Sequence, residues 1–215
     1  MKFEPIAIIG QSCILPGALS PDALWDAVVN GRDLTSKVGP NEWGIPTASV
    51  LEGAFGNGER AFCDVGGYVR GFESVFDPAG FHLDQNVVAS LDTASQWLLH
   101  AGRRALASAS VKDTSHTGAV IGNLSFPTRA MADYSARKWL GDELADLVGL
   151  PVESAKSRFM SGLPADILAT GLGLGEQAYA IDAACASSLY AIKLACDQLH
   201  DGKARTMLAG AVCAS

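Results

Sequence analysis

Short apolar runs separated by segments with helical spacing are the feature that most limits how this chain can fold. The runs are PIAIIG at residues 5–10, TGAVIGNLS at 117–125, QAYAID at 177–182 and TMLAGAV at 206–212. Continuous rather than alternating apolar residues are typical of strands that are buried on both faces of a sheet. Strands that alternate with helices predict an α/β layered domain whose sheet is largely buried.

The segments between these runs predict helices. Ser20 is a suitable N-cap for a helix that has Pro21 at its first position and ends before Gly31. Apolar residues at helical spacing predict one long amphipathic helix over residues 84–108. Residues 128–170 are predicted to be mostly helical, with breaks at Gly141, Pro151, Gly162 and Pro164.

Two further segments complete the predicted organisation. Residues 31–80 are rich in Gly and Pro without a sustained period, so a long irregular excursion is expected there. A last helix is predicted after Cys185, closed by Gly202. Its expected apolar face consists of Leu189, Ile192, Cys196 and Leu199.

Composition and charge exclude several classes of protein. The chain has 215 residues, 48% of them hydrophobic, which suits one domain or a large half-domain with a sizeable core. A net charge of −7 without a basic stripe argues against a nucleic-acid or anionic-membrane surface. No run approaches the ~18 apolar residues needed to span a bilayer. Five cysteines, none in a C-x-x-C pair, disfavour a disulfide framework or a thiolate metal site and predict reduced, cytoplasmic thiols.

Cys185 lies where the run at 177–182 passes into the last predicted helix. Such a junction stands at the carboxyl edge of the sheet, where α/β folds place their sites. Free N–H groups and the positive end of the helix dipole favour a thiolate there, and the same N–H groups suit an oxyanion. Two interpretations stay open from this context, a nucleophile or a small buried core residue. The core interpretation is expected for the other cysteines, Cys13, Cys63, Cys196 and Cys213.

Other polar residues are expected to play structural parts. Asp182 is predicted to hold the turn before Cys185 through backbone hydrogen bonds rather than to act as an acid or base. GLGLG at 171–175 precedes a strand and is predicted to be a loop, not a dinucleotide cradle. The histidines are expected to be solvated or structural residues; they are His82, His100, His116 and His200.

DAACASSL at residues 182–189 resembles the active-site motif of the β-ketoacyl synthases, whose common form is D-T-A-C-S-S-S-L. Cys185 matches the acyl-accepting cysteine. IAIIGQSCILPGALSPDALWDAVVNGRDLTSKVGPNEWGIP at 6–46 is similar to the family's opening, and TGAVIGNLS and MLAGAV match two later landmarks. Ala183 and Ala186 replace the usual Thr and Ser. LDTASQWLLHAGRRAL lacks the D-P-Q-Q-R of modular polyketide synthases and looks closer to fatty-acid or polyunsaturated-fatty-acid types, so the subfamily stays open.

The resemblance implies a thiolase-like fold, in which two related α/β halves build a layered α/β/α/β/α architecture. Residues 1–215 correspond to the N-terminal half, the β-ketoacyl synthase N-terminal domain. The two histidines, or His and Asn, that act on the extender lie in the family's second half and have no match here. The chain is therefore expected to accept an acyl group on Cys185 without completing condensation.

The implied activity is that of an acyltransferase, a β-ketoacyl-carrier-protein synthase of fatty-acid or polyketide biosynthesis. Cys185 would take an acyl group from the phosphopantetheine arm of an acyl carrier protein, for decarboxylative condensation with a malonyl thioester. No bound cofactor or metal is expected. The expected partners are the carrier protein and a second condensing-enzyme chain, in a homodimer or heterodimer that buries Tyr179 and its strand.

Two other functions remain as alternatives. A non-catalytic partner subunit, similar to a chain-length factor, is favoured by the missing histidines. Retention of Cys185 favours the enzyme, because such partners usually lack that cysteine. A thiolase is a weaker third hypothesis, since its cysteine lies in a different local sequence.

Overall fold

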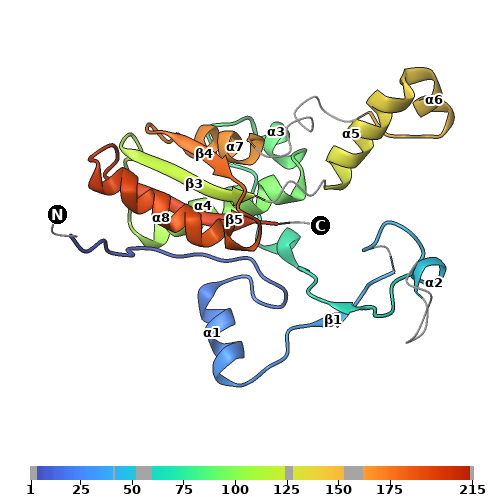
Figure 1. Ribbon diagram of the computed structural model, residues 1–215, viewed down its shortest axis with the longest axis horizontal. Coiled ribbons are helices and arrows are strands. Elements are labelled where there is room, and N and C mark those ends of the chain that lie inside the picture. Colours follow the sequence, from blue (N-terminus) through green and yellow to red (C-terminus); the bar gives the residue numbers. More distant parts are fainter. Residues whose placement is uncertain (1–3, 41, 52–59, 124–127, 153–161, 214–215) are drawn as a thin grey trace. The chain divides into compact units, whose positions relative to one another are not determined.

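The computed structural model describes residues 4–40, 42–51, 60–123, 128–152 and 162–213 (Figure 1). It divides into two compact units, one formed by Met1–Gln11 with Asp77–Ser215 and the other by Ser12–Phe76. The larger unit carries the sheet and Cys185.

The sheet of the larger unit has three parallel strands in the order β4-β3-β5 (Figure 1). They are β3 (Thr117–Asn123), β4 (Ala178–Ile181) and β5 (Thr206–Val212). The central strand β3 is buried along its whole length. Three of the predicted strands are thereby confirmed, as is the α/β class; residues 124 and 125 of the first of them lie outside the described residues.

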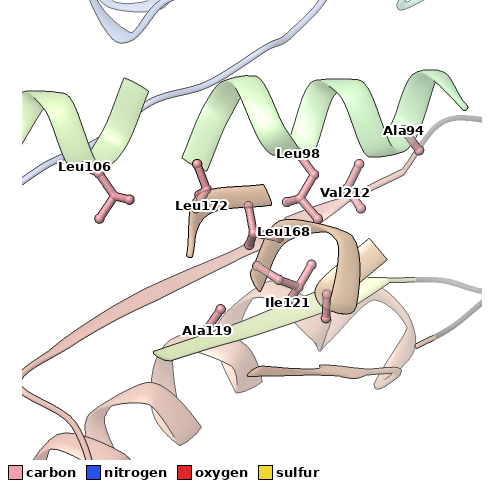
Figure 2. Packing of buried hydrophobic residues seen from close by; sticks show 9 residues of the cluster. Ala94, Leu98, Leu106, Ala119, Ile121, Leu168, Leu172 and Val212 are labelled. Atoms are coloured by element: carbon pink, nitrogen blue, oxygen red, sulfur yellow. The ribbon is translucent and has the colours of Figure 1, made fainter. Parts of the chain in front are cut away.

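Helices cover both faces of this sheet. On one face, α4 (Thr93–Ser108) and α7 (Leu163–Leu172) pack against Ala119 and Ile121 of β3. Figure 2 shows the leucines of these two helices converging on that face of the strand. On the other face, α8 (Ser187–His200) packs against Val120. Alternate β3 residues therefore serve two cores, as expected for a strand buried on both sides.

The long helix predicted over residues 84–108 is two helices. α3 spans Gln85–Ala89, and α4 begins anew at Thr93. The side chain of Asp92 accepts a hydrogen bond from the N–H of Ala94 at 2.9 Å, which caps α4 and ends the continuity of the helical backbone. Apolar spacing runs through both helices and does not reveal such a break.

The strand predicted at residues 5–10 is absent. Ile8 is 90% exposed and none of these described residues is in a strand. The segment instead runs past helix ends, since the carbonyl of Glu4 accepts a hydrogen bond from Nε2 of His200 and Gly10 lies against Ala105 of α4. In the described residues this run pairs with neither β4 nor β5, and an apolar run becomes a strand only where its backbone pairs with a neighbour.

The apolar face predicted for α8 is not the face that packs on the sheet. Ser187, Ala191 and Ala195 are buried, whereas Leu189 is 69% and Ile192 50% exposed. The small residues pack inward because α8 approaches β3 closely. Counting large apolar residues at helical spacing therefore selected the wrong face.

The described parts of residues 128–170 are mostly helical, as predicted. α5 (Arg129–Leu140) and α6 (Asp142–Leu147) meet at Gly141, which has φ of +81°. Pro164 lies in the first turn of α7, where proline is tolerated, rather than at a break. Residues 153–161 lie outside the described residues. No described helix is long and apolar enough to cross a membrane.

The smaller unit is mostly irregular, as predicted for residues 31–80. It begins with α1 (Pro21–Val29), whose cap Ser20 accepts a hydrogen bond from the N–H of Ala23. Its other described elements are β1 (Ser36–Lys37) paired antiparallel with β2 (Val65–Gly66), α2 (Thr47–Val50) and the short 3₁₀ helix η1 (Phe72–Ser74). Arg70 ties this unit together, since its guanidinium donates to Glu42, Ser36 and the carbonyl of Lys37.

Candidate active site

Cys185 lies in a single 3₁₀ turn, η3 (Ala184–Ala186), between the end of β4 and the first residue of α8. The turn follows the carboxyl end of a parallel strand, as predicted, and the cysteine is exposed. Cys185 is therefore not a buried core residue. Its exposure leaves the thiol open to a substrate.

The other cysteines only partly fit the expected core role. Cys13 and Cys196 are half-buried, and burial raises the pKa of the Cys13 thiol. Cys63 and Cys213 are exposed, so the prediction that they fill the core is wrong. Small size permits a cysteine in a core but does not require one, because local packing decides its burial.

Asp182 holds the turn before Cys185, as predicted. Its Oδ1 accepts a hydrogen bond from the N–H of Ala184 at 2.9 Å. The geometry is that of a side chain bonding to the backbone two residues further on. The carboxylate is thus engaged by the backbone of the residue next to Cys185.

Ser187 holds the same turn from the other side. Its hydroxyl accepts the N–H of Ala183 at 2.9 Å and donates to the carbonyl of Ala184 at 2.7 Å. The backbone N–H of Ser187 also bonds to that carbonyl. Only 4% of Ser187 is exposed, so little water competes for these bonds.

Ala184 has φ of +50°, a left-handed conformation that is rare outside glycine. For a residue with a Cβ this conformation costs about 1–2 kcal/mol. Asp182 accepts a hydrogen bond from the N–H of Ala184, and Ser187 donates one to its carbonyl. Together these bonds hold Ala184 in the left-handed conformation. The backbone immediately before Cys185 is therefore strained and held.

Gly122 of β3 allows Ser187 to lie where it does. A Cβ at Gly122 would stand 2.7 Å from the Cβ of Ser187 and 3.1 Å from the Cβ of Ala211. Sequence reasoning missed both Gly122 and Ser187. A glycine inside an apolar strand was the available signal, since it often marks a close approach by another part of the chain.

Two histidines lie toward the opposite end of the sheet from Cys185. His116 precedes β3, and its Nδ1 is 3.1 Å from Oε1 of Glu176. His200 ends α8, roughly 20 Å along the helix from its start at 1.5 Å per residue. Both were expected to be structural or solvated, and both are exposed.

The remaining two histidines also lie outside the turn that carries Cys185. His100 is buried in α4, where burial first, and then the charges of Arg103 and Arg104, lower its pKa. His82 is exposed, and its backbone N–H donates to the carbonyl of Gly171. Within the described residues no three His, Cys, Asp or Glu side chains are grouped so that they could hold a metal ion.

GLGLG, at residues 171–175, ends one helix and leads to the next strand. Gly173 caps α7 with φ of +62°, and the chain then enters β4. The glycines therefore end a helix and lead through a short loop into a strand, which confirms the predicted loop. They do not form the strand-to-helix turn of a dinucleotide site.

The sequence model described as beta-ketoacyl synthase, N-terminal domain, matches residues 3–215. The chain belongs to the β-ketoacyl synthase family. This confirms the family that the motif around Cys185 indicated. The β-ketoacyl synthase chain is also similar to much larger curated proteins and to solved structures.

Among curated relatives, the chain is 31% identical over 210 residues to a mycoketide-CoA synthase of Mycobacterium tuberculosis, covering 97% of this chain and 5% of that protein. It is 31% identical over 220 residues to a mycocerosic acid synthase-like polyketide synthase of Mycolicibacterium smegmatis, covering 97% and 9%. The β-ketoacyl synthase chain thus spans a tenth or less of the length of these relatives.

Among solved structures, the PfaC keto synthase-chain length factor superposes with a TM-score of 0.85 at 34% identity, over 97% of this chain and 24% of that one. An oxazolomycin ketosynthase domain of Streptomyces albus JA3453 superposes with a TM-score of 0.73 at 22% identity, over 97% of this chain and 35% of that one. It therefore shares the fold. These ketosynthases confirm the thiolase-like α/β fold of the chain.

Proposed function

We propose that Cys185 is the acyl-accepting nucleophile of a β-ketoacyl synthase. The observation that carries this proposal is the exposure of Cys185 in the η3 turn at the carboxyl end of β4, within a motif that resembles the family's active-site motif. A thiol in that place is reachable by the thioester at the end of a flexible carrier arm. Residues 1–215 would supply the acyl-accepting half of the enzyme.

The proposed step is thioester exchange. The Cys185 thiolate attacks the carbonyl carbon of an acyl thioester, a carbon–sulfur bond forms, and the carbonyl electron pair moves to oxygen. The tetrahedral oxyanion then collapses, the bond to the phosphopantetheine sulfur breaks, and the departing thiolate takes up a proton. The acyl group remains on Cys185, and no electrons are exchanged with any third partner.

The acylated enzyme would then condense with a malonyl thioester that loses carbon dioxide, as in fatty-acid and polyketide biosynthesis. Curated relatives named as polyketide synthases support this assignment. The substrates would arrive on the phosphopantetheine of an acyl carrier protein. A second condensing-enzyme chain would pair at the edge strand β4, where Tyr179 is half-buried.

A second candidate function is that of a chain-length-factor-like partner. The name of one solved neighbour, a keto synthase-chain length factor, gives a specific reason to consider it. The presence of Cys185 favours the catalytic assignment. The two candidates differ in one measurable property, transfer of an acyl group to that thiol.

The test is site-resolved mass spectrometry after incubation of the protein with hexanoyl-N-acetylcysteamine thioester at neutral pH. Cys185 should gain the hexanoyl group faster than Cys63 and Cys213, which are also exposed and serve as internal controls. Cys185→Ala should remove the fast phase and Cys213→Ala should not. Equal or slower acylation of Cys185 in folded protein would refute the assignment and favour the partner subunit.

A further inference from the structure

We infer that Ser187 is a positioning residue for Cys185, because its hydroxyl fixes the direction in which the backbone N–H of Cys185 points. This inference rests on the proposed acyl-accepting function. Ser187 does not itself contact the reacting atoms. It acts through the peptide unit that joins Ala184 to Cys185.

The peptide unit between Ala184 and Cys185 is held at its carbonyl end. Its carbonyl oxygen belongs to Ala184 and accepts both the hydroxyl and the backbone N–H of buried Ser187. A trans peptide is planar, and its C=O and N–H point in opposite directions. With the carbonyl held toward Ser187, the N–H of Cys185 is directed away from the buried helix start, toward the exposed side.

Ala184 adopts a strained conformation that its hydrogen bonds maintain. Its φ of +50° is unfavourable for alanine, so the backbone would leave this region if its hydrogen bonds were lost. Rotation there would turn the plane of the following peptide and take the Cys185 N–H with it. The Ser187 hydroxyl, which bonds to Ala183 N–H as well as to Ala184 carbonyl, opposes that rotation.

Ser187 is itself held in place by close contact with strand β3. Its Cβ faces Gly122 of β3 so closely that a methyl group on that glycine would stand 2.7 Å away. The backbone carbonyl carbon of Ser187 lies 2.9 Å from the same point. Contact with a buried strand fixes the hydroxyl relative to the sheet. The direction of the Cys185 N–H is therefore fixed relative to the buried strand β3.

The chemical consequence depends on the reagent. Attack of Cys185 on a thioester places negative charge on the carbonyl oxygen, and an N–H directed at that oxygen lowers the barrier. Alkylation by iodoacetamide displaces iodide and forms no oxyanion. Ser187 should therefore matter much more for acylation than for alkylation at the same sulfur.

The experiment compares the two reagents on Ser187→Ala, with Ser188→Ala, an exposed neighbour on the same helix, as the matched control. For Ser187→Ala, acylation of Cys185 by hexanoyl-N-acetylcysteamine should fall ~10-fold or more, which is part of the ~100-fold that removal of one oxyanion donor costs, because the Cys185 N–H is turned and not removed. Iodoacetamide labelling should change less than about threefold, because the thiolate itself is retained. Ser188→Ala should change neither rate.

A rescue variant separates positioning from general structural support. Glycine adopts positive φ without strain, so Ala184→Gly in the Ser187→Ala background should restore acylation by about threefold or more. Equal losses with both reagents, no loss with either, or a selective loss that glycine does not rescue would each overturn the inference.

A measurement on the unmodified protein keeps the inference testable should a variant fail to fold. In amide hydrogen exchange, the N–H groups of Ala183 and Ala184 should be protected by their bonds to Ser187 and Asp182, and that of Cys185 should exchange faster. A Cys185 amide as protected as its neighbours would overturn the inference. If Cys185 of the unmodified protein is not selectively acylated, the proposed function is wrong. If Cys185 is selectively acylated in the unmodified protein and equally fast in Ser187→Ala, only the positioning role is wrong.

Discussion

A methyl group on Gly122 would stand 2.7 Å from the Cβ of Ser187, closer than any normal carbon–carbon contact. Strand β3 and the start of α8 therefore meet at this point with only the side chain of Ser187 between them. Further along α8, Ala191 and Ala195 pack in the same way against Val120. Small residues on both elements bring the helix that follows Cys185 close to the sheet.

Gly122→Ala should therefore destabilise the fold. The added methyl group overlaps a side-chain carbon and a backbone carbon of Ser187, and overpacking of a core costs typically about 1–3 kcal/mol. The free energy of unfolding should be measured by urea denaturation. Gly210→Ala is the control, since a Cβ on this β5 glycine meets nothing within 4 Å. A loss for Gly122→Ala no larger than for Gly210→Ala would contradict the close packing.

The sheet could be predicted from the sequence because its strands are marked locally. The runs at 117–125, 177–182 and 206–212 are apolar, β-favouring and bounded by turns. The burial on both faces that this pattern predicts is confirmed for the central strand β3, whereas β4 is half-buried and β5 is partly exposed. The position of Cys185 follows in turn from the order of strand and helix. These features depend on neighbours in the sequence, which reasoning from sequence can use.

The remaining features depend on contacts between distant residues. Residues 5–10 have the pattern of a strand, yet in the described residues their backbone pairs with neither edge strand, β4 or β5. The inward face of α8 is set by the closeness of β3, not by the hydrophobicity of its own residues. The role of Ser187 cannot be predicted from the sequence, because the two hydrogen bonds of its hydroxyl form only once the turn is folded.

Asp182 should prove to be a residue of the turn and not a general base. Asparagine keeps the Oδ1 acceptor for the N–H of Ala184 but cannot take up a proton, so Asp182→Asn should acylate Cys185 within about threefold of the original rate. Asp182→Ala loses the acceptor and should be slower than the asparagine variant. Removal of a true general base costs ~100-fold or more, so a loss of that size in Asp182→Asn would reverse the assignment.

The pKa of the Glu42 carboxyl group should lie far below the usual value for a glutamate, 4.5. Two hydrogen bonds from Arg70, at 2.6 and 2.7 Å, and a further one from the N–H of Gly39 lower its pKa to about 2. Carbon-13 NMR of the side-chain carboxyl group during an acid titration measures this directly. Arg70→Gln removes the largest cause and should return the midpoint toward the usual 4.5. A midpoint near 4.5 in the unmodified protein would show that the pair does not form in solution.

His100 should make stability fall as the solution becomes acidic. Burial, aided by the charges of Arg103 and Arg104, holds the pKa of His100 below its usual 6.5 in the folded protein. Below pH 6.5 the unfolded chain therefore binds a proton that the folded chain resists, so stability from this group is full above pH 6.5 and declines as pH falls toward the folded pKa.

Urea denaturation at pH 7.5, 6.5 and 5.5 measures that decline, and His100→Gln should make it shallower because glutamine does not titrate in this range. His82→Gln is the matched control, since His82 is exposed. Carboxylates that titrate at lower pH contribute equally to all three proteins, so the comparison isolates the histidine. An identical pH dependence in the original protein and His100→Gln would mean that His100 accepts a proton as readily folded as unfolded, contrary to its burial in α4.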